Sequence, residues 1–252
     1  MDDERNEMDE RVIDVADVEV RFDDVVAVDG LDFAVRRGER VAVLGQTGAG
    51  KSTLMNLLIG ALAPTSGSVR VAGLDPVEDW SAMQGKIAIA FQGPRLLPWR
   101  TATGNVAVGL QVLGVGREQR TTKAKDWLRR VNLGDALDRF PSQLSGGMRQ
   151  RVALARAFAV EPEVLLLDES FSALDEVTAS RLRADFLRVA EEARTTSVIV
   201  THSIQEAFEL GHRVVVLRKP AVVAHVYTSA DHDLSDPYAV AHLRHEVHEL
   251  MA

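Results

Sequence analysis

The chain has 252 residues, of which 46% are apolar, so it is long enough to bury the core of one large α/β domain. It contains no cysteine and no apolar run of about 18 residues, which excludes disulfides, thiolate metal sites and an encoded membrane span. The formal net charge is −8. The N-terminus also lacks the basic-then-apolar pattern of a secretion signal, so we expect a cytoplasmic chain unless a partner holds it at a membrane.

Most of the negative charge lies at the start of the chain. Residues 1–19 contain nine carboxylates but only two arginines, a net charge of −7 that leaves the remainder close to neutral. This charge density predicts a disordered acidic tail at residues 1–14, followed by a main domain at 15–219 and an extension at 220–252. The balanced remainder gives no electrostatic indication of a nucleic-acid partner.

Strand and helix patterns then follow one another along the main domain. Residues 18–22 and 31–35 alternate in polarity, as in an early antiparallel sheet. Nearly continuous apolar runs predict a central, mainly parallel sheet with strands at 41–44, 87–91, 164–167, 197–201 and 214–217. Helical patterns separate them at 53–62, 148–160 and 179–193. No strand is evident between 100 and 139, so we expect an inserted helical subdomain at about 93–160.

A phosphate-binding pattern follows the strand predicted at 41–44. It reads Gly45-Gln46-Thr47-Gly48-Ala49-Gly50-Lys51-Ser52, and Thr53 opens the next helical run. Glycines let backbone N–H groups face phosphate oxygens, while Lys51 would reach the β- and γ-phosphates and Ser52 would bind Mg²⁺. A glycine-rich turn that only joins strand to helix is the competing interpretation. The adjacent Lys51 and Ser52 favour nucleotide binding.

Two carboxylates, Asp168 and Glu169, end the strand predicted at 164–167. That end of a parallel sheet faces the crevice where ligands bind. Asp168 would hold Mg²⁺, partly through water, and Glu169 would polarise the water that attacks the γ-phosphate. Alone, such a pair is more often an ordinary helix cap, but together with the phosphate-binding loop it predicts hydrolysis.

A second candidate anion site precedes the helix predicted at 148–160. Ser145, Gly146 and Gly147 would place a hydroxyl and backbone N–H groups at the N-terminus of that helix. Read alone, Ser-Gly-Gly is usually a flexible turn. The ordered set of motifs resembles the ATPases of ABC transporters, and its members are the loop at 45–52, the segment from Leu144, Asp168-Glu169, the segment Ser172-Ala173-Leu174-Asp175, and His202.

The resemblance runs from about Val18 to Leu217 and implies specific roles. It implies a head-to-tail dimer, in which ATP lies between the loop of one copy and residues 145–147 of the other. By the same resemblance, Phe22 would stack on adenine, with an ordinary strand residue as the less favoured interpretation. Gln92 would contact Mg²⁺ and the attacking water, and would link the site to membrane subunits. His202 would contact the γ-phosphate.

A narrower resemblance begins at Gln92. The stretch Phe91 to Arg100, followed by Asn105-Val106 and Gly109-Leu110, is similar to importer ATPases for nitrate, taurine and alkanesulfonates. It implies integral-membrane permease subunits, a solute-binding protein acting with them, and a place on the inner face of the membrane. Leu96, Leu97 and Trp99 would either cover the core or receive a permease helix. The transported solute is not encoded in these motifs.

Some residues depart from the importer pattern. Gln46-Thr47 replaces Pro-Ser, Gly93 replaces an acidic residue, Ser170 replaces Pro and Ser203 replaces Asp. Gln46 and Thr47 contribute mainly backbone, so binding should survive. Ser170 and Ser203 affect the rate of the reaction more than its nature, and Gly93 weakens the narrower resemblance. His242, His245 and His248 suggest a metal site, but steps of three drift around a helix, so we expect a surface amphipathic helix.

Two rival functions come from other classes. An ABC-type ATPase acting on DNA or ribosomes would need a coiled coil, a second cassette or a basic surface, and the sequence has none of these. A nucleotide-binding regulator without turnover is disfavoured by Lys51, Asp168, Glu169 and His202, although Ser170 and Ser203 leave it open.

Overall fold

The computed structural model describes residues 11–251, which fall into two compact units. The first unit contains residues 11–83 and 196–251, and the second contains Gln84–Thr195. The elements of the first unit are β1 (Arg11–Phe22), β2 (Val25–Arg36), β3 (Arg40–Gly45), α2 (Lys51–Leu58), β4 (Ser66–Val71), β7 (Thr196–Thr201), α7 (Ile204–Leu210), β8 (Arg213–Arg218), β9 (Val222–Thr228), a 3₁₀ turn η3 (Ser229–Asp231) and α8 (Pro237–Met251).

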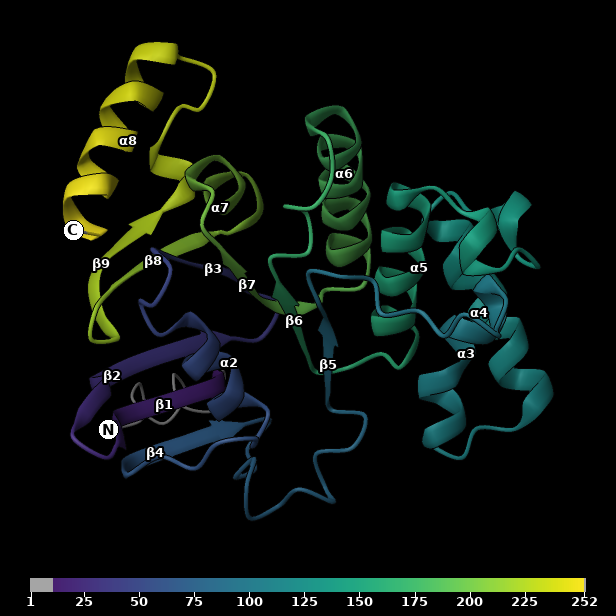
Figure 1. Cartoon of the computed structure of the whole chain (residues 1–252), viewed down its shortest axis with the longest axis horizontal. Helices are drawn as coiled ribbons and strands as arrows, with labels where there is room; N and C mark the ends of the chain where they lie inside the picture. The colour runs from purple at the N-terminus through teal and green to yellow at the C-terminus, as the bar shows by residue number, and fades with distance from the viewer. Residues whose placement is uncertain (1–10, 252) are drawn as a thin grey trace. The chain divides into compact units, whose positions relative to one another are not determined.

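An antiparallel sheet of order β2-β1-β4 forms one layer of the first unit. Figure 1 shows these three strands side by side, with α2 next to them. Val15 of β1 lies opposite Phe33 of β2 and Val69 of β4, and all three side chains are buried. The alternation of apolar and polar residues therefore gives the sheet one face that packs inward, as the sequence predicted.

The strand β1 is longer than the sequence predicted. It begins at Arg11, so residues 11–14, which were assigned to the acidic tail, belong to the sheet. Val12 and Ile13 explain the difference, because both are buried and Ile13 pairs with Val35 and Val71. The rest of the predicted tail, residues 1–10, lies outside the described residues.

The same unit contains a second group of strands. β3 pairs in parallel with β7 and β8, and β9 pairs with β8 in the antiparallel direction. Every residue of β7 and all but the first of β3 are buried, as expected for strands covered on both faces. The strands β4 and β9 were not predicted, and β9 lies in the segment that was assigned to the C-terminal extension.

The second unit is mainly helical. Its elements are β5 (Ile87–Ala90), α3 (Ala102–Val112), α4 (Arg117–Arg130), 3₁₀ turns η1 (Gly134–Ala136) and η2 (Pro141–Gln143), α5 (Gly146–Ala159), β6 (Val164–Asp168) and α6 (Glu176–Glu192). In Figure 1, α3, α4 and α5 gather together. Trp127 of α4 stacks on Phe158 of α5 with ring centroids 5.3 Å apart, which joins these helices through a buried aromatic pair.

The pairing of β5 and β6 places the functional segments of the second unit. These strands are parallel, with Ala90 opposite Leu167, so their carboxyl ends lie at the same edge. Gln92 follows β5 by two residues, Asp168 ends β6, and Glu169 comes directly after it. The α/β class, with a mainly parallel set of strands and a separate antiparallel sheet, is confirmed.

Candidate functional site

The phosphate-binding loop connects β3 to α2 in the first unit. Gly48 and Gly50 have φ angles of 85° and 87°, in the left-handed region that favours glycine. A Cβ atom on Gly50 would lie 2.2 Å from Cβ of Ala221, and one on Gly45 would lie 2.9 Å from the carbonyl oxygen of Leu217. The loop therefore requires glycine for backbone conformation and for close packing.

Lys51 is folded back over this loop. Its side chain is 7% exposed, and Nζ donates hydrogen bonds to the carbonyl oxygens of Gly45 at 2.6 Å and Gln46 at 3.0 Å. The first turn of α2 contains no acidic residue, so nothing in that turn offsets the positive potential of the helix N-terminus. Ser52 is exposed in the same turn. This arrangement suits a phosphate group.

Gln92 and Glu169 come together in the second unit. Gln92 Nε2 lies 3.5 Å from Glu169 Oε2 and 3.4 Å from Ser172 Oγ, while Ser172 Oγ donates to the carbonyl oxygen of Glu169 at 2.9 Å. Glu169 has φ 44°, an uncommon conformation for a residue with a side chain. Strained backbone of this kind often marks functional sites, and the long contacts of Gln92 suit a site that tightens around a ligand.

The segment at 145–147 opens α5. Ser145 Oγ accepts a hydrogen bond from the backbone N–H of Met148 at 3.3 Å, so Ser145 caps the helix. A Cβ atom on Gly147 would lie 2.5 Å from Cγ2 of Thr178. Gly147 thus lies against the start of α6, and Ser145 and Gly146 are exposed there.

Asp175 caps the neighbouring helix α6. Its Oδ1 accepts from the backbone N–H of Thr178 at 3.0 Å. Hydrogen bonds from the side chain and then from the backbone of Thr178 lower the pKa of Asp175, which keeps this carboxylate ionised. The loop that bears Asp175 and the start of α5 therefore meet at Thr178.

Phe22 and His202 belong to the first unit and are both exposed. Phe22 ends β1 with 50% of its surface exposed, opposite the exposed Val25. His202 directly follows β7. Ser203 then caps α7, because its Oγ accepts from the backbone N–H of Glu206 at 3.3 Å. The serine found in place of the expected aspartate thus retains a capping role.

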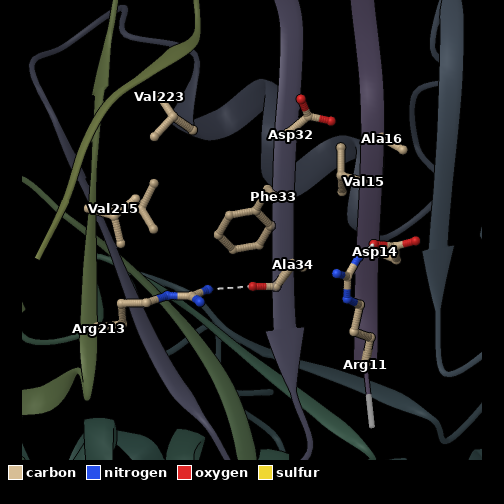
Figure 2. Close-up of a pocket in the computed structure, with 11 residues that line it drawn as sticks. Arg11, Asp14, Val15, Ala16, Asp32, Phe33, Ala34, Arg213, Val215 and Val223 are labelled. Carbon is tan, nitrogen blue, oxygen red and sulfur yellow. Dashed lines mark hydrogen bonds and ion pairs between the residues drawn. The ribbon is translucent and has the colours of Figure 1, made fainter. Parts of the chain in front are cut away.

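Figure 2 shows a pocket of about 420 Å³ in the first unit. It is lined by Arg11, Asp14, Val15, Ala16, Asp32, Phe33, Ala34, Arg213, Val215, Val223 and Val226. Its arginines are engaged within the protein, since Arg11 pairs with Asp14 and Arg213 donates to the carbonyl oxygen of Ala34. None of the predicted site residues lines this pocket.

The helix α8 has one buried face, formed by Leu243, Val247 and Met251. His245 Nε2 lies 3.3 Å from Glu249 Oε1 at the surface. Among residues 11–251, no group of three His, Cys, Asp or Glu side chains is arranged to hold a metal ion. In the same part of the chain, no helix is both long and apolar enough to span a membrane.

The comparisons with known proteins identify the family. The model of the family described as "ABC transporter" matches residues 28–172. The chain belongs to the ABC transporter family. This assignment confirms the predicted resemblance and, with it, the prediction of an ATP-binding ATPase.

Several ABC relatives are ATP-binding proteins of importers. The aliphatic sulfonates import ATP-binding protein SsuB 1 of Mesorhizobium japonicum is 42% identical over 200 residues, which cover 79% of this chain and 73% of that protein. The nitrate import ATP-binding protein NrtD of Synechococcus elongatus is 40% identical over 194 residues, covering 76% and 69%. The glycine betaine/proline betaine transport system ATP-binding protein ProV of Escherichia coli is 36% identical, and the chain spans about half of its length, 51%.

Solved ABC structures share the fold. The dimeric post-hydrolysis state of the ATP-binding cassette MJ0796, bound to ADP and Pi, superposes with a TM-score of 0.74 at 30% identity, covering 86% of this chain and 98% of that one. The structure of cbiO1 from Clostridium perfringens, part of the transporter complex cbiONQ, gives a TM-score of 0.82 at 25% identity, covering 96% and 100%.

Sequence reasoning missed several residues that hold the Gln92 segment. Gln150 and Arg156 of α5 donate to main-chain oxygens of residues 91, 94 and 95, and the Ser170 hydroxyl donates to that of Ala90. Their acceptors are carbonyl groups, which every residue carries. The sequence therefore contains no motif that could have indicated these contacts.

Proposed function

We propose that this ABC ATPase energises the uptake of a small solute through a separate permease. The observation that carries the proposal is the phosphate-binding loop of β3 and α2, with Lys51 held across it by Gly45 and Gln46. The importer relatives support the direction of transport. The solute would be of the sulfonate or nitrate kind, small and anionic, as the names of those relatives suggest.

In this proposal Lys51 exchanges the carbonyl oxygens of Gly45 and Gln46 for the β- and γ-phosphate oxygens of ATP. Residues 45–53 supply backbone N–H groups, and Phe22 supplies an exposed ring on which adenine would stack. The exchange is favourable because a phosphate oxygen is charged and a carbonyl oxygen is not. The left-handed conformations of Gly48 and Gly50 support this role of the loop.

Each unit carries predicted oxygen donors of the kind that Mg²⁺ prefers. They are the Ser52 hydroxyl on the first turn of α2, the Asp168 carboxylate at the end of β6 and the Gln92 amide oxygen. Hard divalent cations prefer such ligands, often with water between the carboxylate and the ion. When bound, Mg²⁺ supplies positive charge that offsets the charge of the phosphate oxygens.

Glu169 is proposed as the base that accepts a proton from the attacking water. Its Oε2 lies 3.5 Å from Gln92 Nε2, so an amide hydrogen is available to orient the carboxylate. His202, exposed after β7, would donate to the γ-phosphate oxygens as charge develops on them. Positioning and charge stabilisation dominate such phosphoryl transfers.

Two copies of the chain would act together, head to tail. Ser145, Gly146 and Gly147 would contact the ATP held by the partner copy, with Asp175 in the loop between the copies. The exposure of Ser145 and Gly146 at the start of α5 supports this role, as does the absence of acidic residues from its first turn. The dimeric state of the MJ0796 cassette is consistent with it.

A permease surface is proposed around Trp99, whose side chain is 71% exposed. Asn105 is fully buried and donates to the carbonyl oxygens of residues 97, 100 and 101, while it accepts from the backbone N–H of Leu97. This network fixes the turn that presents Trp99, which favours docking over a role in the core. The chain would then lie on the inner face of the membrane, held by its permease.

The test compares the unaltered chain with Glu169→Gln. The altered chain should bind ATP as tightly as the original, while steady-state hydrolysis falls by roughly a hundredfold or more, because the base is lost and the shape is kept. Nucleotide affinity and phosphate release would both be measured. Normal hydrolysis by Glu169→Gln would exclude the role proposed for this carboxylate.

A further inference from the structure

The segment that carries Gln92 is held by side chains from two directions. Ser170 Oγ donates to the carbonyl oxygen of Ala90 at 2.8 Å, and Gln150 Nε2 donates to that of Phe91 at 3.1 Å. Arg156 donates to the carbonyl oxygens of Pro94 and Arg95, both at 2.9 Å. Four carbonyl groups, two on each side of Gln92, are therefore fixed in place.

These donors are themselves well packed. Ser170 is 2% exposed and Gln150 is 3% exposed. Arg156 is half-buried, and burial lowers the pKa of its guanidinium. Two N–H groups of this guanidinium donate to carbonyl oxygens of neighbouring residues. Because the donors form a rigid fork, those oxygens have little freedom to move.

The segment does not adopt its conformation from local preferences alone. Arg95 has φ 42°, and its guanidinium carbon lies 4.0 Å from the centre of the Phe91 ring. A left-handed conformation at a residue with a side chain persists when surrounding contacts impose it. Here Arg156 binds the carbonyl oxygen of Arg95 itself. The contacts from α5 thus impose the course of the chain immediately after Gln92.

The Gln92 side chain contacts Glu169 and Ser172, and its contacts there are long, at 3.5 Å and 3.4 Å. We propose that Ser170, Gln150 and Arg156 are positioning residues for hydrolysis, which hold the main chain of residues 90–95 so that the Gln92 amide meets Glu169. None of the three needs to touch ATP in this role. The inference rests on the proposed roles of Gln92 and Glu169.

A small displacement of this segment has a large expected effect. Misplacement of about 1 Å by a change away from the reacting atoms can cost on the order of a hundredfold in rate. ATP binding should change much less, because Lys51 and its loop belong to the other unit. The turnover number kcat should therefore fall while KM for ATP stays nearly the same.

The experiment measures kcat and KM of the full chain for Arg156→Gln alone and in a Gln92→Ala background. Arg151→Gln is the matched control, because Arg151 lies on the same helix but pairs with Asp185 at 3.0 Å. We expect Arg156→Gln to lower kcat at least about tenfold, and to lower it no further once Gln92 is absent. Arg151→Gln should leave kcat close to that of the unaltered chain.

Ser170→Ala is a milder substitution that tests the same role in case Arg156→Gln folds poorly. It removes one hydroxyl group and leaves the rest of the side chain in place. It should also lower kcat only when Gln92 is present. Equal decreases in both backgrounds, or equal decreases for Arg151→Gln and Arg156→Gln, would overturn the inference. Normal hydrolysis by Glu169→Gln would instead exclude the proposed role of Glu169 on which the inference rests, so that failure can be distinguished from a failure of the positioning role.

Discussion

The two parts of the predicted machinery are built in different ways. The phosphate-binding loop consists of consecutive residues, Gly45 to Ser52, between one strand and one helix. The cluster around Gln92 combines residues at the ends of β5 and β6 with hydrogen-bond donors from α5. Residues in contact within it lie up to 80 positions apart in the sequence. The loop should tolerate substitutions in other parts of the chain but not among its own residues. The cluster around Gln92 should also depend on residues that never contact the ligand.

The largest effect is expected for Lys51→Ala in the loop. Removing a buried cation that binds phosphate should weaken ATP binding by about a hundredfold or more, since such pairs contribute on the order of 3 kcal/mol. Calorimetric titration with ATP would measure the affinity. Lys86→Ala is the control, because Lys86 pairs with Glu163 at 2.6 Å in the other unit and should retain ATP affinity. Equal affinities for the unaltered chain and Lys51→Ala would contradict the loop assignment.

The glycines of the phosphate-binding loop and of the start of α5 should differ in their tolerance of a methyl group. Gly50→Ala forces a left-handed residue and an overlap with Ala221, and should lower the unfolding free energy by about 2–4 kcal/mol. Gly147→Ala should cost less, because Gly147 is helical, where alanine is favoured, and its neighbour Thr178 Cγ2 belongs to a side chain. Denaturant unfolding measures both. A larger loss for Gly147→Ala would reverse the comparison.

The smallest effect is expected outside both regions, at Tyr227. Its hydroxyl donates to Glu246 Oε1 at 2.9 Å and ties β9 to α8, so Tyr227→Phe should cost about 1 kcal/mol near neutral pH. Burial, then the contact with Glu246, raises the pKa of Tyr227 above its ordinary value of about 10.

This raised pKa sets a pH dependence. The folded chain keeps its phenol proton where the unfolded chain loses it, so the stabilisation is complete below about pH 10 and declines above it. Tyr227→Phe should therefore lose less stability than the unaltered chain between about pH 10 and 12. Thermal unfolding across this range would test it, and identical alkaline profiles would contradict it.

The loop could be predicted from the sequence because the spaced glycines and the Lys-Ser pair are the residues that would bind the phosphates. The sequence revealed β3, β6 and β7 because strands covered on both faces are almost continuously apolar. β4 was not predicted because only Val69 and Val71 are buried in it. β9 was not predicted because it is exposed at His225 and Val226, so neither strand forms a continuous apolar run.

The cluster around Gln92 was predicted only in part. Resemblance supplied Gln92, Asp168 and Glu169, but spacing could not place Ser172 within reach of Gln92. It also could not show that Ser170 has a hydrogen-bonding role where proline was expected. Such contacts depend on the pairing of β5 with β6, which brings distant residues together only in the fold.

The most direct test of the central claim is the mass of Glu169→Gln in solution, measured by light scattering with and without ATP and Mg²⁺. If ATP lies between the loop of one copy and residues 145–147 of the other, blocked hydrolysis should trap a dimer. We expect the mass of two chains with ATP and of one chain without it, and the mass of one chain again when Lys51→Ala is added. A single-chain mass at saturating ATP would contradict the account.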